Sequence, residues 1–350
     1  MAKKLELEDC SLNCGSKSNI MNRVFLFLVF FIAACSSNQY VLQADQVGQW
    51  VEVKATDGSE PKQRHEAAFI AVGDKFYLLG GRGIKSTSIY DTKTQSWSEG
   101  ATVPLEIHHF QPVVYQDKIY IMGALTGGYP GETPIPNIYI YDPASDSWEK
   151  GPAIPADRQR GGAGVSLYQG KIYLSCGIKD GHRGDHKKWL DLYDPQTESW
   201  TSLPDAPRPR DHFQSVVAED KLYLLGGRTT IAADNPMKNT IAEIDVFDFK
   251  TQKWSTLPNG LPTLRAGNYA TLYGKDILVM GGESFNQVPA HAEVEALNLK
   301  TKQWRQLRPM LQGRHGTGVI LHQGQLFVAS GSGNRGGGPE LSTMECLSFD

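Results

Sequence analysis

Six tryptophans recur along this 350-residue chain at intervals of 47, 51, 52, 54 and 50 residues. They are Trp50, Trp97, Trp148, Trp200, Trp254 and Trp304. In five of the six units, an aromatic residue or a leucine followed by Asp or Asn stands seven residues before the tryptophan, as in Tyr90-Asp91. A period of about 50 residues with a constant internal spacing indicates an array of one supersecondary unit. The repeat therefore constrains the fold more than any other feature.

Each unit predicts four short strands. Residues 67–72 are apolar, Gly73-Asp74 provides a tight turn, and residues 75–81 form a second apolar run that ends in a glycine pair. A two-residue Gly-Asp turn between apolar runs is typical of a β-hairpin. A third strand then ends at Asp91, and a fourth carries Trp97.

The paired glycines, the aromatic-Asp step and the tryptophan seven residues later resemble the repeat signature of the kelch family. The resemblance covers about 300 residues, from Gln49 to the C-terminus. It implies an all-β fold, a six-bladed β-propeller in which each repeat forms one four-stranded blade. The departures from the pattern are Ile107, Ala124, Cys176 and Ser330.

The two ends of the repeat array predict how the propeller closes. The last unit stops at Asp350 without a tryptophan strand, whereas residues 50–53 precede the first complete unit and have no strands of their own. We therefore expect the N-terminal strand to complete the sixth blade of a propeller domain that spans residues 49–350. Such pairing removes open sheet edges.

The N-terminal segment 1–34 predicts a leader with a lipoprotein signal peptide. Residues 24–34 are eleven apolar residues, too few for a membrane-spanning helix, and they are followed by Cys35. The small residues before Cys35 resemble the bacterial lipobox, so we expect Cys35 to be lipidated, segment 35–48 to form a tether, and the protein to lie at the outer membrane of the cell envelope. Met21 is the expected initiator, and the alternative is an ordinary secretion signal with an incidental cysteine.

The charge composition excludes one class of binding partner. A net charge of -3 with 21% charged residues argues against a nucleic-acid binder.

The propeller contains two cysteines once the leader and the lipidated Cys35 are set aside. These are Cys176 and Cys346, which belong to blades on opposite sides of the ring. We expect both to be free, buried thiols and the protein to be a monomer.

The segments that differ in length between repeats indicate which face of the propeller binds a ligand. The turns between the first and second strands are short, and the spacing fixes the hairpins between the third and fourth. Variation is confined to the loops between the second and third strands and to the crossovers between blades, which open on the same face. Such insertions usually mark the binding face of a repeat protein.

Charged residues recur on that face, at the start of the innermost strand. Five blades place an arginine there: Arg64, Arg160, Arg210, Arg265 and Arg314. The position next to it holds a histidine or an aspartate in four blades, and two further histidines lie one residue later: His65, His108, Asp211 and His315, then His109 and His212. One interpretation is a ring of guanidinium groups at the channel mouth that binds an anionic ligand, as the resemblance to kelch propellers that bind acidic peptides implies. The other is a structural role, in which the arginines tie neighbouring blades through loop carbonyls.

The blade-three loop adds further candidates. Residues 179–186 contain two His and two Asp, among them His182 and Asp185, and Trp189 is the only tryptophan outside the repeat phase. Hydrogen bonding and stacking with a ligand, a metal site and a merely solvated loop are the alternatives, and the spacing matches no established metal motif. Tyr129 in the blade-two loop offers a second aromatic surface.

Two enzymatic resemblances are weaker. The family includes galactose oxidase, but Cys176 and Cys346 lack the Tyr-His partners of its copper site, so a copper oxidase, a bound metal and a cofactor are not expected. The kelch sugar mutarotases that act on sialic acid use a Glu and an Arg, for which Glu283 and Arg265 are candidates. The leading hypothesis is a lipid-anchored propeller that binds an anionic glycan, a small molecule or an acidic peptide. A sugar mutarotase and an envelope interaction scaffold are the alternatives.

Overall fold

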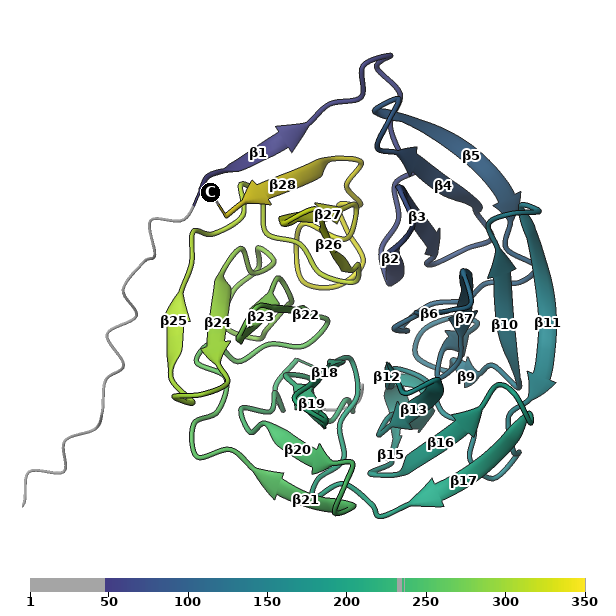
Figure 1. Cartoon of the computed structure of the whole chain (residues 1–350), viewed down its shortest axis with the longest axis vertical. Coiled ribbons are helices and arrows are strands. Elements are labelled where there is room, and N and C mark those ends of the chain that lie inside the picture. Colours follow the sequence, from purple (N-terminus) through teal and green to yellow (C-terminus); the bar gives the residue numbers. More distant parts are fainter. Residues whose placement is uncertain (1–47, 232–234, 236, 350) are drawn as a thin grey trace, which may run out of the picture. The chain divides into compact units, whose positions relative to one another are not determined.

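A computed structural model describes residues 48–231, 235 and 237–349. The predicted leader and Cys35 lie outside the described residues. The described part forms six four-stranded antiparallel sheets arranged around a centre, which confirms the six-bladed all-β propeller (Figure 1). From the innermost to the outermost strand, the blades are β2 (Ala67–Val72), β3 (Lys75–Gly80), β4 (Ser86–Asp91) and β5 (Ser96–Thr102); β6 (Val113–Tyr115), β7 (Lys118–Ile121), β10 (Asn137–Asp142) and β11 (Ser147–Ala153); β12 (Gly164–Tyr168), β13 (Lys171–Ser175), β16 (Leu190–Asp194) and β17 (Ser199–Leu203); β18 (Gln214–Ala218), β19 (Lys221–Leu225), β20 (Asp245–Asp248) and β21 (Lys253–Thr256); β22 (Tyr269–Tyr273), β23 (Asp276–Met280), β24 (Val294–Asn298) and β25 (Trp304–Gln306); and β26 (Val319–His322), β27 (Gln325–Ala329), β28 (Met344–Ser348) and β1 (Trp50–Val53).

The seven-residue spacing between the aromatic residue and the tryptophan has a direct structural cause. It makes the two residues cross-strand partners of the outer hairpin, as with Tyr141 on β10 and Trp148 on β11. Their ring centroids lie 5.1 Å apart, and Trp148 Nε1 donates a hydrogen bond to the carbonyl of Ala101 in the preceding blade. The repeated pair therefore joins strands within a blade and neighbouring blades to each other.

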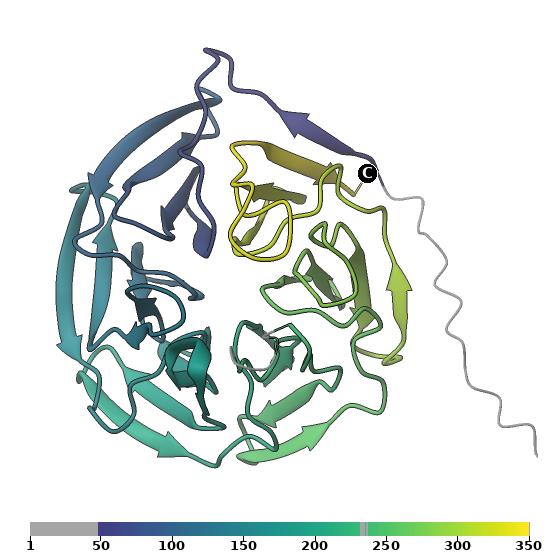
Figure 2. The same ribbon diagram turned by 180° about the vertical axis from the view of Figure 1, so that it is seen from behind.

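The N-terminal strand closes the ring, as predicted. β1 pairs with β28, and Trp50 lies opposite Leu347. The Trp50 side chain is buried, and its Nε1 donates to the carbonyl of Arg308 at 3.0 Å. Figure 2 shows the closed ring from behind, with the last strand, β28, beside the first strand, β1. The sixth blade thus combines the two ends of the propeller.

The two cysteines of the propeller are free and buried, which confirms the prediction. Burial raises the pKa of the Cys176 thiol to about 12, so this thiol stays protonated and unreactive at neutral pH.

The loops between second and third strands form small structures of their own in blades two and three. Blade two carries the ribbon β8 (Leu125–Thr126) and β9 (Thr133–Pro134), and blade three carries β14 (Ile178–Asp180) and β15 (Gly184–His186). A single 3-10 turn, η1 (Gly181–Arg183), connects β14 with β15. No helix in the described ranges has the length and apolar character needed to cross a bilayer. We call the side of the propeller that bears these loops the loop face.

Candidate functional site

Six residues, one from each blade, surround the centre of the propeller with a closed circle of backbone hydrogen bonds. We call them the channel ring: Glu66, His109, Gly162, His212, Gly267 and Gly316. Each has a left-handed backbone with φ between 52° and 64°. The amide of each residue after Glu66 donates to the carbonyl of the preceding ring residue, and the amide of Ala67 closes the circle on the Gly316 carbonyl. The donor-acceptor distances lie between 2.7 and 3.2 Å.

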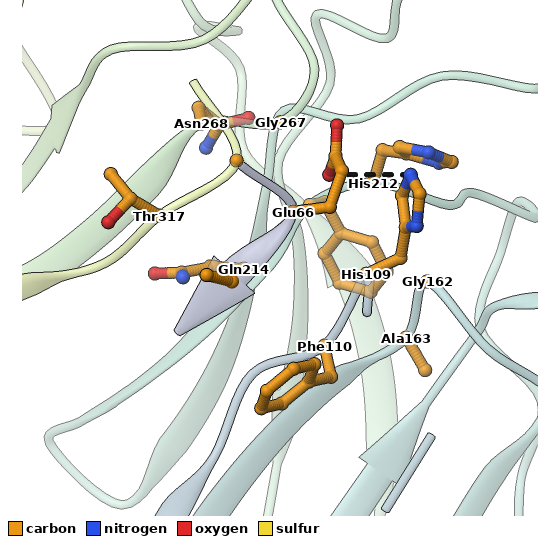
Figure 3. A pocket seen from close by; sticks show the side chains of 13 residues that line it. Glu66, His109, Phe110, Gly162, Ala163, His212, Gln214, Gly267, Asn268 and Thr317 are labelled. Atoms are coloured by element: carbon orange, nitrogen blue, oxygen red, sulfur yellow. Dashed lines mark ion pairs between the residues drawn. The ribbon is translucent and has the colours of Figure 1, made fainter. Parts of the chain in front are cut away.

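Three members of the channel ring carry charged or titratable side chains. Figure 3 shows Glu66, His109 and His212 clustered together, with Glu66 Oε2 3.3 Å from His109 Nε2. A left-handed backbone costs an L-residue with a side chain roughly 1–2 kcal/mol, a penalty that glycine avoids. Strained residues of this kind cluster at functional sites, so these three positions are candidates.

A cavity of about 580 Å³ opens on the loop face beside the channel ring. Its volume falls within the usual range for small-molecule sites. The cavity is lined by His65, Glu66, Arg82, Glu106, His109, Gly128, Tyr129, His182, Arg228, Met237, Glu283, Gly336 and Gly337. Carboxylates, imidazoles and guanidinium groups therefore converge on one concave surface.

Arg228 and Glu283 form a buried ion pair in the cavity wall. Arg228 Nη1 lies 2.5 Å from Glu283 Oε1, and the Gly336 amide donates to Glu283 Oε2 at 2.7 Å. Burial opposes ionisation of Glu283, but His315 and Arg228 outweigh it and lower the pKa of this carboxyl to about 2. Glu283 is therefore a carboxylate at neutral pH.

A histidine connects the two carboxylates of the cavity. His315 Nδ1 lies 3.6 Å from Glu66 Oε1, and His315 Nε2 lies 3.5 Å from Glu283 Oε2. The carbonyl oxygens of Asn334 and Gly336 lie 2.9 and 2.8 Å from the same Nε2. His315 thus lies between two proton acceptors that both face the cavity.

Another wall is organised around Glu132, which is completely buried. Its Oε1 lies 2.5 Å from Arg82 Nη2 and 2.9 Å from His182 Nδ1. Burial opposes ionisation of Glu132, but His182 and Arg82 outweigh it and hold its pKa well below the usual range. Tyr129 is exposed, and its ring centroid lies 5.0 Å from that of His182.

Three imidazoles from three blades meet beside the channel ring. The ring centroids of His109, His182 and His212 lie 4.5 to 5.1 Å apart, and all three residues are buried. One ligand atom of each lies within 4.8 Å of the other two, close enough for a metal-binding cluster. Burial, together with neighbouring His212 and His108, holds the pKa of His109 well below its ordinary value. His109 is therefore neutral at physiological pH.

The structure brings four of the predicted binding residues together. His65 and His182 line the cavity, His212 belongs to the channel ring, and His315 contacts the two cavity carboxylates.

Two predicted residues of the blade-three loop lie elsewhere. Asp185 is exposed and pairs with Lys187, and Trp189 lies with its ring centroid 4.1 Å from the guanidinium carbon of Arg158. Of the candidates predicted in this loop, His182 is the one that reaches the cavity lining.

The five repeated arginines do not form the expected ring at the channel mouth. Their side chains turn back into the blades and are almost fully buried: Arg64, Arg160, Arg210, Arg265 and Arg314. Arg210, for example, donates to the Gly226 carbonyl at 2.8 Å and pairs with Asp245 at 2.7 Å. Their guanidinium groups bond carbonyls of their own blade, so the arginines link strands within blades rather than neighbouring blades.

The same burial corrects the predicted pair of Glu283 and Arg265. Glu283 lines the cavity, but Arg265 pairs with the buried carboxylate of Glu295. Arg228 takes the place beside Glu283 that was expected for Arg265.

Sequence reasoning missed four residues of the site: Glu66, Arg82, Glu132 and Arg228. A signal existed for two of them, because Arg82 and Arg228 directly follow the glycine pair that ends the second strand. Glu283 occupies the same position in blade five. Glu132 lies inside the blade-two loop, where no repeat phase applies.

The fold and this site define a β-propeller protein with a polar cavity at the mouth of its channel. A family model described as Attractin/LZTR1 beta-propeller matches residues 36–282, and one described as Kelch motif matches residues 265–311. The chain belongs to the kelch-repeat β-propeller family.

Known relatives support this assignment. The Kelch-like protein terF of Aspergillus terreus is 29% identical over 352 residues, covering 92% of this chain and 72% of its own length. Kelch-like protein 25 of Xenopus tropicalis is 24% identical over 233 residues, and the match covers 63% of this chain and 37% of that protein. The solved structure of YjhT superposes with a TM-score of 0.69 at 17% identity, covering 81% of this chain and 95% of YjhT. At that identity the likeness shows the fold alone.

Proposed function

We propose that the loop-face cavity binds an acidic sugar and catalyses its mutarotation, the interconversion of the two anomers. The observation that carries the proposal is the grouping of two ionised carboxylates, Glu66 and Glu283, on either side of His315 in one cavity. Mutarotation needs a group that accepts the proton of the anomeric hydroxyl and one that protonates the ring oxygen as the ring opens. It requires no cofactor.

Both carboxylates are ionised at neutral pH, as a group that accepts a proton must be, and His315 lies between them. Glu66 is held ionised because His315 and His212 outweigh the effect of burial and lower its pKa. The carboxylate that takes the proton of the anomeric hydroxyl becomes a carboxylic acid, and it returns this proton to the ring oxygen as the bond between that oxygen and the anomeric carbon breaks. Ring closure on the other face of the carbonyl then gives the second anomer and restores the protein.

Guanidinium groups support an acidic substrate. Arg82 and Arg228 both line the cavity, and the side chain of Arg82 keeps 21% of its surface exposed there. A guanidinium group binds a carboxylate by directional, charge-assisted hydrogen bonds. The resemblance to the sialic acid mutarotases favours the same substrate class.

The proposal is tested by measuring anomeric exchange of N-acetylneuraminate by NMR in the presence of purified full-length protein. We expect faster exchange than in buffer, reduced about 10²–10⁴-fold by Glu283→Gln, as for the loss of a general base. Asp185→Asn, at an exposed site away from the cavity lining, is the matched control. Binding of the sugar without faster exchange would leave an anionic-ligand binding protein. If the protein neither binds the sugar nor accelerates its exchange, the result would favour the interaction scaffold.

We also infer that Cys35 is lipidated and anchors the protein to the envelope. The support is the apolar run of residues 24–34 and the small residues before the cysteine. Labelling cells with a radioactive fatty acid should mark the wild type and not Cys35→Ser, which should also leave the membrane fraction. An unlabelled wild type would contradict the anchor.

A further inference from the structure

The cluster of His109, His182 and His212 is built from three separate parts of the chain. Two members belong to the channel ring, in blades two and four. Between them in the ring stands Gly162 of blade three, which has no side chain. Blade three instead supplies His182 from the turn η1 in its extended loop, with ring centroids 5.1 and 4.9 Å from the other two. The insertion therefore brings a third imidazole to the pair.

His212 has the surroundings of a metal ligand. Its Nδ1 hydrogen-bonds the carboxylate of Asp211, and that carboxylate is held by the Thr230 amide at 3.0 Å and by His186 Nε2 at 2.9 Å. Metal-binding histidines usually have a carboxylate on the ring nitrogen that faces away from the metal. The other nitrogen of His212, Nε2, is buried and has no hydrogen-bond partner among the described residues.

The other two imidazoles follow the same plan. His182 Nδ1 lies 2.9 Å from the carboxylate of Glu132, and His109 Nδ1 lies 2.6 Å from His108 Nδ1. The contacts at Nδ1 of His212 and His109 are hydrogen bonds, so Nε2 of these two rings is left for a shared ligand. His182 Nδ1 lies near its carboxylate without a hydrogen bond among the described residues. His109 Nε2 in turn lies 3.3 Å from Glu66.

The backbone conformation of His109 and His212 indicates that their side chains have a function. His109 and His212 have φ values of 55° and 52°, whereas the equivalent residues of blades three, five and six are glycines. Because glycine satisfies the fold at this position, the two imidazoles are retained at a cost in backbone strain. The free energy of metal binding would offset this backbone strain.

The geometry points to a binding site for one first-row divalent metal ion, of the Zn²⁺ type, formed by His109, His182 and His212. Zn–N bonds of about 2.0–2.1 Å place tetrahedral ligand atoms about 3.4 Å apart. The ligand atoms here lie within 4.8 Å of one another, so small side-chain rotations complete the site. Imidazole ligands suit zinc, copper, iron and nickel.

The site would leave one coordination position free for the cavity. His109 and His182 both line the cavity, as does Glu66, whose carboxylate is placed to become a fourth ligand or to bind a metal-bound water. Three histidines with an open position are the arrangement of catalytic rather than structural zinc sites. The ion would polarise an oxygen of any ligand that enters the cavity. The metal site does not depend on the sugar proposed above.

Metal binding can be tested without a ligand. Full-length protein without a histidine tag is stripped with a chelator and titrated with Zn²⁺ by calorimetry, and Co²⁺ is added as a spectroscopic probe. We expect one ion per chain and a Co²⁺ visible spectrum of imidazole coordination. His212→Gly, which adopts the residue used by three other blades, should abolish both signals while circular dichroism stays unchanged.

Two further variants separate coordination from folding. His182→Gln removes the ligand from a surface loop rather than from the channel ring and should also abolish binding. Asp211→Asn should weaken binding about 10- to 100-fold, as expected for the partner of a ligand. Asp185→Asn, in the same blade-three loop as His182 but exposed and outside the cluster, should bind the ion as the wild type does. A wild type that does not bind one ion per chain would overturn the metal site. So would wild-type affinity for the ion in both His212→Gly and His182→Gln.

Discussion

Two positions at the start of each innermost strand lie two residues apart and differ in how they vary between blades. The first is arginine in five blades, and in each the side chain bonds strands of its own blade. The second belongs to the channel ring and changes from blade to blade: Glu66, His109, Gly162, His212, Gly267 and Gly316. The repeated position maintains the blade, whereas the varied position shapes the site. In a repeat protein, departures from the repeat are therefore the better guide to function.

The largest expected effect comes from the repeated position. Arg210→Ala removes the fully buried ion-pair partner of Asp245, whose carboxylate then keeps only the pair with the partly exposed Arg208. Removing one partner of a buried ion pair typically costs about 3–5 kcal/mol. We expect a large loss of unfolding free energy in urea, with unchanged sugar affinity per folded molecule. A stable variant that fails to bind would mean that Arg210 acts in the site after all.

Glu283→Gln should reduce stability in a pH-dependent manner. The folded pKa of Glu283 is lowered from 4.5 to about 2, so its carboxylate stabilises the fold above pH 4.5, and this contribution is lost as the pH falls toward 2. The shift corresponds to about 3 kcal/mol at neutral pH. Urea unfolding of both proteins should give a constant difference above about pH 5.5 that shrinks below pH 4.5. A difference independent of pH would contradict the ion pair with Arg228.

The ring glycines should differ among themselves. A Cβ on Gly316 would lie 2.7 Å from the backbone nitrogen of Glu66, whereas the atom nearest to one on Gly267 would be Nδ1 of His315, at 3.4 Å. Both positions have a left-handed backbone, so each alanine variant bears strain of about 1–2 kcal/mol. We expect Gly316→Ala to lower the melting temperature clearly more than Gly267→Ala. Equal melting temperatures would show that the backbone at blade six moves enough to accommodate the added methyl group.

The smallest effect on stability is expected for His109→Gly. Relief of the left-handed strain offsets the lost contacts with His108 and Glu66, so the unfolding free energy should change by less than about 1 kcal/mol. Loss of metal binding with a nearly unchanged melting temperature would confirm that the varied position shapes the site and does not maintain the blade. A loss of several kcal/mol would instead make His109 a structural residue.

The fold could be predicted from the sequence because the repeat reports strand pairing directly. The spacing from Tyr90 to Trp97 reflects a cross-strand pair, and the unpaired tryptophan strand at residue 50 reveals the closure. Each of these is a local pattern repeated or completed elsewhere in the chain.

The site was only partly predictable. The variation in loop length located the right face, and His65, His212 and His315 lie at the site, but the spacing of a repeat does not tell which way a side chain points. Arg64 and Glu66 are two residues apart, yet one enters the blade and the other faces the channel, because Glu66 has a left-handed backbone. Glu132 and His182 come from loops whose paths depend on tertiary contacts between blades two and three.

The pairing of β1 with β28 joins the part of the propeller that is synthesised first to the part that is synthesised last. At typical rates of translation, roughly 15–60 s separate the two strands as they leave the ribosome. Throughout this interval Trp50 has no partner strand, and the growing array presents a bare sheet edge of the kind that invites wrong pairing. A chain that lacks either end therefore cannot close the ring, and such incomplete chains carry the greatest risk of aggregation.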